Sequence, residues 1–162
     1  MTTEFSIRPM IPNDASRLKE IIDLSFSRFV RFFALHSVLE EGQVLVTETQ
    51  EAIVVGFAKL IQFQIRGANF GCILWIAVHP QFRRRGIAAS LVNTGVENLK
   101  NAGATAVFAS IRRRNLASLT VFGKQGFRKM GFLELWRLFG SQIFNLYREI
   151  WLAPGEVVLM HD

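Results

Sequence analysis

Residues 74–100, LWIAVHPQFRRRGIAASLVNTGVENLK, form the stretch around which the rest of the chain can be placed. Residues 74–78 are a short apolar run that predicts a buried strand, which Pro80 ends. Three arginines and Gly86 follow. Apolar residues then return at a helical spacing, at Ala88, Leu91, Val92, Val96 and Leu99. We therefore predict a strand, a basic turn and a helix in immediate succession.

The basic turn at Gly86 is a candidate anion site. The start of a helix carries N–H groups without partners and the positive end of the helix dipole. Gly86 has no Cβ that would stand between these groups and an oxyanion, and residues 83–85 add three full charges. A phosphate or diphosphate is the favoured ligand. The alternative is a solvated turn in which Gly86 only begins the helix.

Two motifs carry a resemblance to a known family. Arg83-x-x-Gly86-x-Ala88 resembles the diphosphate-binding motif of the GNAT superfamily of acyl-coenzyme A-dependent N-acyltransferases. Residues 115–127, NLASLTVFGKQGF, resemble the segment of that family in which an Asn opens a helix and Gly-Phe follows its end. A predicted strand at residues 106–111 lies between the two motifs. Together they cover roughly the central third of the chain, and their order makes the pair more specific than either alone.

The resemblance implies a fold, a reaction and a set of site residues. The fold is α/β (α+β): a mixed, mostly antiparallel sheet of about seven strands, splayed in the middle and flanked by helices. The reaction is direct attack of an acceptor amine on the thioester of acetyl-CoA, with the main-chain N–H of Val78 on the developing oxyanion. The residues implied in coenzyme binding are Ile76, Ala77, Val78, Arg83, Arg84, Arg85, Gly86, Ile87, Ala88, Asn115, Ser118 and Phe122.

The catalytic acid and base are less well defined. Many members of the family carry a tyrosine acid seven residues after the helix-opening Asn, and this chain has Phe122 there. Tyr147 is the only tyrosine and therefore the only substitute. Glu134, predicted on a strand, and His79, predicted at the surface, are the candidate bases. The absence of the usual tyrosine matters little for the rate if the coenzyme leaves as a thiolate, because a thiol of pKa about 8.5 needs no proton from an acid to leave.

Composition limits the alternatives. A chain of 162 residues, half of them hydrophobic, is expected to form one domain with its own core. No apolar stretch is long enough to cross a membrane, and residues 1–4 open no export signal, so we expect a cytoplasmic protein. The single cysteine, Cys72, excludes an internal disulfide and is expected to be buried, and the three histidines lack metal-ligand spacing. The net charge of +6 favours an anionic partner.

The remaining segments predict the rest of the sheet. Strands are expected at residues 5–10, 43–49, 52–64, 70–79, 127–138 and 157–161, with Gly56 at a bulge or close approach and a turn at residues 66–69. A helix capped by Asn13 or Asp14 is expected to run to about Ser27. A second helix, at residues 29–39, carries aromatic residues that form either core or a lid over the acceptor. Residues 139–155 are a helical cover, a homodimer contact or a wall of the acceptor site.

Three functions follow from these patterns. The first is an N-acetyltransferase that uses acetyl-CoA and an amine acceptor, without a metal. The second is a relative that binds acyl-CoA as a sensor or subunit without turnover, because Phe122 replaces the usual acid. The third is a nucleic-acid-binding module that uses the arginine triplets 83–85 and 112–114. The third is weakest, because the aromatic residues lie in apolar runs rather than among the charges.

Overall fold

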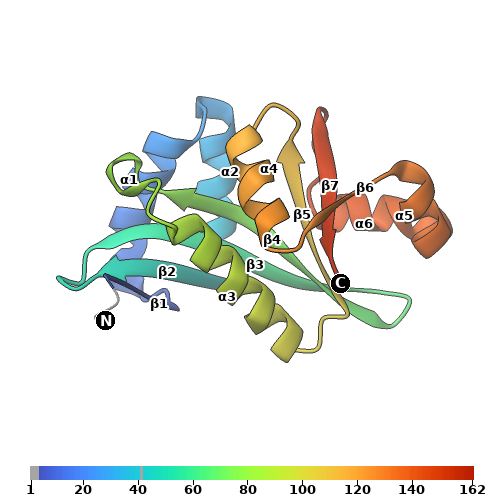
Figure 1. Ribbon diagram of the computed structural model, residues 1–162, viewed down its shortest axis with the longest axis horizontal. Coiled ribbons are helices and arrows are strands. Elements are labelled where there is room, and N and C mark those ends of the chain that lie inside the picture. Colours follow the sequence, from blue (N-terminus) through green and yellow to red (C-terminus); the bar gives the residue numbers. More distant parts are fainter. Residues whose placement is uncertain (1–3, 41) are drawn as a thin grey trace. The chain divides into compact units, whose positions relative to one another are not determined.

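The computed structural model describes residues 4–40 and 42–162 (Figure 1). Residues 1–3, on which the expected lack of an export signal rests, lie outside this range. The strands are β1 (Phe5–Pro9), β2 (Gln43–Thr49), β3 (Val54–Ile65), β4 (Ala68–Val78), β5 (Ala106–Arg112), β6 (Arg128–Met130) and β7 (Glu156–His161). The helices are α1 (Ala15–Ser25), α2 (Arg28–Leu39), α3 (Ile87–Asn101), α4 (Leu116–Lys124), α5 (Phe132–Phe139) and α6 (Ile143–Glu149), with short 3-10 turns at Pro12–Asp14, Pro80–Phe82 and Gly140–Gln142.

The strands form one mixed sheet in the order β1-β2-β3-β4-β5-β7-β6. The β1/β2, β2/β3, β5/β7 and β6/β7 pairs are antiparallel, whereas β4 and β5 run parallel. The β4/β5 ladder extends only from Phe70 opposite Ala106 to Cys72 opposite Phe108, although both strands continue beyond it. The predicted mixed sheet with a splay between these strands is therefore confirmed.

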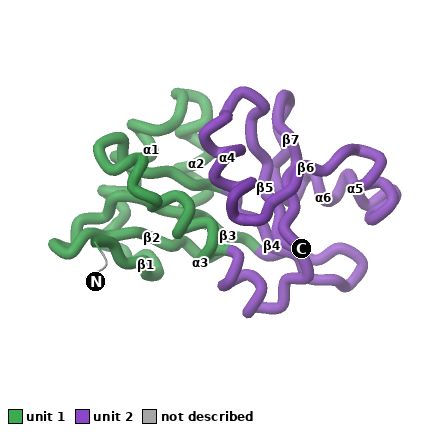
Figure 2. Tube along the Cα trace, in the orientation of Figure 1, with its two compact units in different colours: residues 1–61, 75–95 green, residues 62–74, 96–162 purple. Residues whose placement is uncertain are grey.

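The chain divides into two compact units, coloured separately in Figure 2. Unit 1 comprises residues 1–61 and 75–95, and unit 2 comprises residues 62–74 and 96–162. Strands β3 and β4 and helix α3 each contribute residues to both units. The expectation of a single domain stays a prediction.

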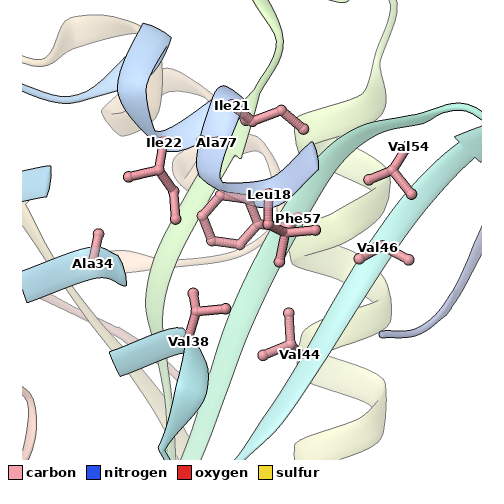
Figure 3. Packing of buried hydrophobic residues seen from close by; sticks show 10 residues of the cluster. All are labelled: Leu18, Ile21, Ile22, Ala34, Val38, Val44, Val46, Val54, Phe57 and Ala77. Atoms are coloured by element: carbon pink, nitrogen blue, oxygen red, sulfur yellow. The ribbon is translucent and has the colours of Figure 1, made fainter. Parts of the chain in front are cut away.

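The core of unit 1 lies between one face of its strands and helices α1 and α2. Figure 3 shows Phe57 of β3 surrounded by side chains from both helices and from β2 and β4. The members of this cluster are Leu18, Ile21, Ile22, Ala34, Val38, Val44, Val46, Val54, Phe57 and Ala77. Leu18, Ile21 and Ile22 form the buried face of α1, Phe26 after its end packs against the cluster, and Ala15 is exposed.

An aromatic cluster and a hydrogen-bonded hairpin stabilise unit 2. The rings of Phe63, Phe70, Phe108 and Phe139 lie 5.4 to 6.4 Å apart between neighbouring centroids. The turn predicted at residues 66–69 is present but shorter: it consists of Arg66 and Gly67, both with positive φ as in a type I′ hairpin, and β4 already begins at Ala68.

The strand predicted at residues 127–138 is wrong. Strand β6 has only three residues, and helix α5 begins at Phe132. The carboxylate of Glu134 accepts a hydrogen bond from Gly131 N–H at 2.8 Å, which satisfies a donor at the helix start. Leu135 and Phe139, four residues apart, are buried on one side of the helix. The periodicity of such a short apolar run fits either a helix or a strand. The hydrogen bond that Glu134 accepts from Gly131 N–H is specific to the start of a helix.

Asp14 does not cap α1 with its side chain as expected, and anchors β1 instead. Its carboxylate accepts two bonds from the Arg8 guanidinium, at 2.7 and 3.0 Å, and one from Ile11 N–H at 2.9 Å. The hydrogen bond from Arg8 is the main cause of a lowered pKa at Asp14. The carboxylate is nearly buried, so its charge depends on this pairing.

We expect Asp14→Asn to lower the free energy of unfolding by about 1–2 kcal/mol at pH 7, measured by urea denaturation, because Arg8 loses its nearly buried partner and keeps only Glu48, at 2.7 Å. Since the folded pKa of Asp14 lies below its unfolded value of about 3.9, this contribution is complete above that pH and is lost as the pH falls through the folded pKa. The control is Asp23→Asn, which removes an exposed pair with Lys19 and should leave the unfolding midpoint nearly unchanged. Equal losses of unfolding free energy in Asp14→Asn and Asp23→Asn would contradict the role of Asp14 as the anchor of β1.

Candidate anion-binding turn and acyl-transfer site

The predicted strand, turn and helix are present in unit 1. Strand β4 ends at Val78, the 3-10 turn Pro80–Phe82 follows, and α3 begins at Ile87. Arg84 and Gly86 have positive φ, at 65° and 79°, so the chain reverses direction just before the helix. The first bond of the helix runs from Ser90 N–H to Gly86 O at 3.0 Å. Gly86 therefore stands at the boundary of α3, as expected.

The main-chain N–H groups of residues 84–88 are open donors. Within residues 4–40 and 42–162 they donate no hydrogen bond, and a Cβ at Gly86 would meet no atom within 4 Å. These groups lie on an exposed turn at the positive end of a fifteen-residue helix. The arrangement suits the oxygen atoms of a phosphate or diphosphate.

The three arginines of the turn are not equivalent. Arg83 donates from Nε to Val78 O at 2.9 Å and from Nη2 to Ser25 Oγ at 3.2 Å, so its guanidinium already holds the end of β4 to α1. Arg85 lies 3.0 Å from Glu4 and over the ring of Phe82. Arg84 is exposed and makes no ion pair with the described residues. Arg84 is therefore the arginine most available to an incoming anion.

The main chain after Val78 is held from both sides. Its carbonyl accepts from Arg83, and the next N–H, that of His79, donates to Val55 O at 2.8 Å. Val55 lies where the β2/β3 register shifts, opposite Thr47 and Glu48. A Cβ on neighbouring Gly56 would lie 3.2 Å from both Ala77 O and the side chain of Ile87. The bulge or close approach predicted at Gly56 is confirmed, whereas nothing in the sequence indicated Ser25 and Val55 as supports of the turn.

His79 is buried rather than at the surface as predicted, with 6% of its area exposed. Its Nδ1 accepts from Gln81 N–H at 3.3 Å, and its Nε2 lies 3.7 Å from Glu20 Oε1. The ring also packs edge-on against Phe82. Both ring nitrogens of His79 therefore face other groups of the protein. These contacts order the turn and leave neither nitrogen directed at an acceptor amine.

The remaining residues of the first motif line the end of β4 and the start of α3. Ala77, Val78 and Ile87 are buried, while Ile76 and Ala88 are partly exposed. The main chain at Ile76 and Val78 is the part predicted to pair with the coenzyme. Gly86, Ala88 and the open N–H groups thus lie together on one segment, as the motif requires.

In unit 2, the second motif forms the helix that was predicted. Asn115 caps α4 by accepting a hydrogen bond from Ser118 N–H at 3.1 Å, and Gly126 follows the helix with φ of 88°. Phe122, in the place of the usual tyrosine, is 2% exposed and packs edge-on against Phe127 at 5.0 Å between centroids. Its ring is therefore part of the packing of unit 2.

We expect Phe122→Tyr to lower the melting temperature without increasing thiol release from acetyl-CoA. The new hydroxyl would be buried beside Phe127, at a cost of about 1–3 kcal/mol if it finds no partner. Phe127→Tyr, at an equally buried ring of the same pair, is the matched control and should behave alike. A tenfold gain in thiol release by Phe122→Tyr alone would instead place this position beside the leaving thiol.

Glu134 and Tyr147 are poorly tuned for proton transfer near neutral pH. The hydrogen bond from Gly131 N–H and the cation of Arg128 hold the pKa of Glu134 below its usual value, which makes it a weaker base. Burial raises the pKa of Tyr147, on α6, which makes it a weaker acid. We therefore assign no proton transfer to either.

Cys72 and the metal-ligating residue types form no second candidate site among the described residues. Cys72 is fully buried, as predicted, and burial raises the pKa of its thiol, so it does not supply a thiolate nucleophile. In the described part of the chain, no three His, Cys, Asp or Glu side chains gather as metal ligands would. None of its helices is long and apolar enough to cross a membrane.

The fold and the turn together define a protein with an open mixed sheet and a turn of open main-chain N–H groups after β4. The sequence profile of the acetyltransferase (GNAT) family matches residues 13–127. The chain belongs to this family, and its class is that of the acetyl-CoA-dependent acyltransferases. A search of curated proteins finds no match.

Several solved structures share the fold. A GNAT-family acetyltransferase from Desulfovibrio desulfuricans has a TM-score of 0.74 at 16% identity, with 98% of each chain covered. A Bacillus subtilis acetyltransferase in complex with CoA has a TM-score of 0.69 at 20% identity, again with 98% of each chain covered. The ribosomal-protein-S18-alanine N-acetyltransferase from Escherichia coli has a TM-score of 0.66 at 15% identity, covering 97% of this chain and 92% of its own. At these identities the likeness shows a common fold.

Proposed function

We propose that this chain moves an acetyl group from acetyl-CoA to a primary amine by direct attack within a ternary complex. The observation that carries the proposal is the row of N–H groups at residues 84–88, which donate no hydrogen bond to the described residues at the start of α3. The family supplies the class of reaction, and CoA is bound in the B. subtilis neighbour.

In this proposal the diphosphate of the coenzyme accepts hydrogen bonds from the N–H groups of residues 84–88, with the charge of Arg84 beside it. The main chain of Ile76 and Val78 pairs with the pantetheine arm, and Val78 N–H stabilises the oxyanion. These roles, and the coenzyme contacts that the resemblance assigns to Asn115 and Ser118, are predictions for each residue.

The chemical step needs no covalent enzyme intermediate. The neutral amine nitrogen forms a bond to the thioester carbon, the C–S bond breaks, and the coenzyme leaves as thiolate. The amine loses a proton to water, and the thiolate, of conjugate pKa about 8.5, takes one from water. Holding the two reactants in line supplies most of the rate. An α-amino group, of pKa about 8, is neutral far more often than a lysine of pKa about 10.4.

The acceptor is an amine of a small molecule, of a lysine or of a protein N-terminus. These are tested by following thiol release with a panel that holds at least one member of each group. We expect release with one group and little with the others. The cytoplasmic location and the homodimer contact through residues 139–155 also stay predictions, and in that segment only Phe144 and Trp151 are large exposed apolar residues.

A second function, that of an acyl-CoA sensor without turnover, is favoured by Phe122 in place of the usual acid. Both functions require acetyl-CoA to raise the melting temperature, so a missing shift would contradict both. A shift with no thiol release on any acceptor would favour the sensor. Tight, salt-dependent binding of an oligonucleotide that CoA does not displace would favour the nucleic-acid module instead.

A further inference from the structure

Helix α2 has two apolar faces, and only one of them is packed. Ala34, Ser37 and Val38 are buried, and Figure 3 shows Ala34 and Val38 turned towards the core of unit 1. The other face is exposed: Phe29 and Leu39 at 75%, Phe32 at 70% and Phe33 at 39%. A helix that is apolar on both sides is expected to be covered on both sides.

The exposed face is a continuous stripe with the spacing of a helix-packing seam. Residues 29, 32, 36 and 39 follow one another at intervals of three, four and three, which are the a and d positions of a heptad pattern. The rings are in contact along it: Phe29 lies 5.1 Å from Phe33, Phe33 lies 5.6 Å from Phe32, and Phe32 stacks on His36 at 6.3 Å. We name Phe29, Phe32, Phe33, His36 and Leu39 the α2 seam.

The size of the α2 seam matches a small dimer interface. Large side chains bury about 150–250 Å² each, so its members at their observed exposure offer roughly 500 Å². Two such faces together bury about 1,000 Å², which is the lower limit of a specific interface. Helix α5 also exposes apolar side chains, but over a shorter stretch. Phe132, Leu133 and Trp136 lie near its start, with Phe132 stacked on Trp136 at 5.9 Å, whereas Leu138 lies about 140° from Leu133 around the axis.

The charges at the two ends of the α2 seam make it complementary to itself. Arg28 precedes the seam and Glu40 follows it. In the described part of the chain Arg28 makes no ion pair. The Glu40 carboxylate pairs with His36 at 2.9 Å and interacts electrostatically with Lys59, which donates to the Glu40 carbonyl at 2.9 Å. Suppose that two copies of α2 pack antiparallel through their exposed faces, with the twofold axis at the height of residue 34 along the helix. Arg28 of each copy then faces Glu40 of the other. The same operation sets Phe29 against Leu39 and Phe32 against His36.

We propose that this protein forms a twofold-symmetric dimer through the α2 seam, with α2 of a second copy as its occupant. The contact is isologous, because each facing pair occurs twice, once on either side of the axis. The apolar stripe supplies the attraction, and the two Arg28–Glu40 pairs fix the antiparallel direction. This assembly is independent of the reaction proposed above.

Sedimentation velocity of the full chain over a range of about 1–100 μM tests the proposal. We expect a dimer in the parent and a monomer for Phe32→Glu, which sets a carboxylate in the middle of the stripe. Leu133→Glu, at an exposed leucine of α5, is the matched control and should remain dimeric. Circular dichroism melts and the acetyl-CoA thermal shift report that each variant is folded.

A charge exchange tests the antiparallel geometry. Arg28→Glu and Glu40→Arg should each weaken the dimer by about tenfold, because like charges then meet at both ends. When the two variants are mixed in equal amounts, opposite charges meet again at both ends, so native mass spectrometry should show heterodimers in excess of either homodimer. A monomeric parent at 100 μM, a mixture without excess heterodimer, or a dimer broken by Leu133→Glu but not by Phe32→Glu would overturn the proposal. So would a monomeric parent in which Phe32→Glu raises only the acceptor KM, since α2 would then line the acceptor site.

Discussion

Replacing Gly86 with glutamate is expected to abolish the rise in melting temperature that acetyl-CoA gives the parent protein. In the parent, a coenzyme concentration of 100 times Kd adds about 2.7 kcal/mol of stability, which corresponds to roughly 5–10 °C for a chain of this length. The new side chain would extend into the space beside the N–H groups of residues 84–88, which is open in the structure. Its negative charge would repel the diphosphate, so we expect no measurable shift.

The variant also carries a backbone cost that has to be separated from the loss of binding. Gly86 has φ of 79°, a conformation that costs a non-glycine residue about 1–2 kcal/mol. Gly67, in the β3/β4 hairpin, has φ of 80°, and a Cβ there would likewise meet no atom within 4 Å. Gly67→Glu therefore adds the same charge and a similar strain at a turn to which we assign no ligand.

Differential scanning fluorimetry with and without acetyl-CoA distinguishes these effects. Both variants should melt a few degrees below the parent without the coenzyme, by about the strain energy of a left-handed residue. Only Gly67→Glu should recover the full coenzyme shift. A full coenzyme shift in Gly86→Glu would show that the coenzyme binds elsewhere on the protein. The acyl-transfer proposal would then lose its main support.

The sequence predicted the elements that depend on strong local signals. The apolar run ending at Val78, the glycine at the start of α3 and the capping Asn115 each carry a local physical reason, and each is in its expected place. The turn expected at residues 66–69 is also present, although it is confined to Arg66 and Gly67. Local chemistry is sufficient for such features.

The errors arose where an apolar or polar residue fits more than one local structure or environment. Residues 132–139 are apolar enough for either a strand or a helix, and the hydrogen bond from Gly131 N–H to Glu134 selects the helix. The aromatic residues of α2 were expected either in the core or in a lid over the acceptor; the core alternative is wrong, because Ala34 and Ser37 take the packed face and the rings lie outside. His79 was expected at the surface because it precedes a proline, whereas Glu20 and Phe82 enclose it. Of these contacts, only that between Glu20 and His79 joins residues far apart in the sequence.

The site itself was predictable only in part. The motif with Gly86 indicated where main-chain donors would be open, since those follow from the start of a helix. It did not distinguish the three arginines from one another. Their roles depend on Ser25, Val78 and Glu4, which the fold brings to the turn from elsewhere in the chain. The sequence alone therefore assigned the same phosphate-binding role to all three.

Arg83→Gln is expected to lower kcat by about tenfold to a hundredfold while leaving the affinity for acetyl-CoA within about threefold of the parent. Arg83 holds Val78 O and Ser25 Oγ, at 2.9 and 3.2 Å, and so fixes the main chain next to the N–H proposed for the oxyanion. Glutamine is too short to reach both partners. The N–H groups of residues 84–88 stay in place, so the diphosphate is still bound.

Arg84→Gln is the matched variant, and it should change the affinity for acetyl-CoA rather than kcat. Its guanidinium is exposed and makes no ion pair with the described residues, so its loss removes a charge from the anion site without disturbing β4. We expect Kd for acetyl-CoA to rise by about tenfold, with kcat unchanged. Arg84→Lys should keep most of the affinity, because a point charge is sufficient there. Arg83→Lys should not restore kcat, because an ammonium does not reproduce the planar fork of a guanidinium.

A measurement that needs no acceptor completes the comparison. His79 N–H donates to Val55 O at 2.8 Å, on the same peptide group whose carbonyl Arg83 holds. If Arg83 positions this peptide, hydrogen exchange at His79 should accelerate in Arg83→Gln and stay at the parent rate in Arg84→Gln. The alternative result is that Arg83→Gln weakens coenzyme binding as Arg84→Gln does, while kcat and the hydrogen exchange at His79 stay unchanged. Arg83 would then move away from Val78 and contact the diphosphate itself. The two side chains would in that case share the role that the motif alone suggests.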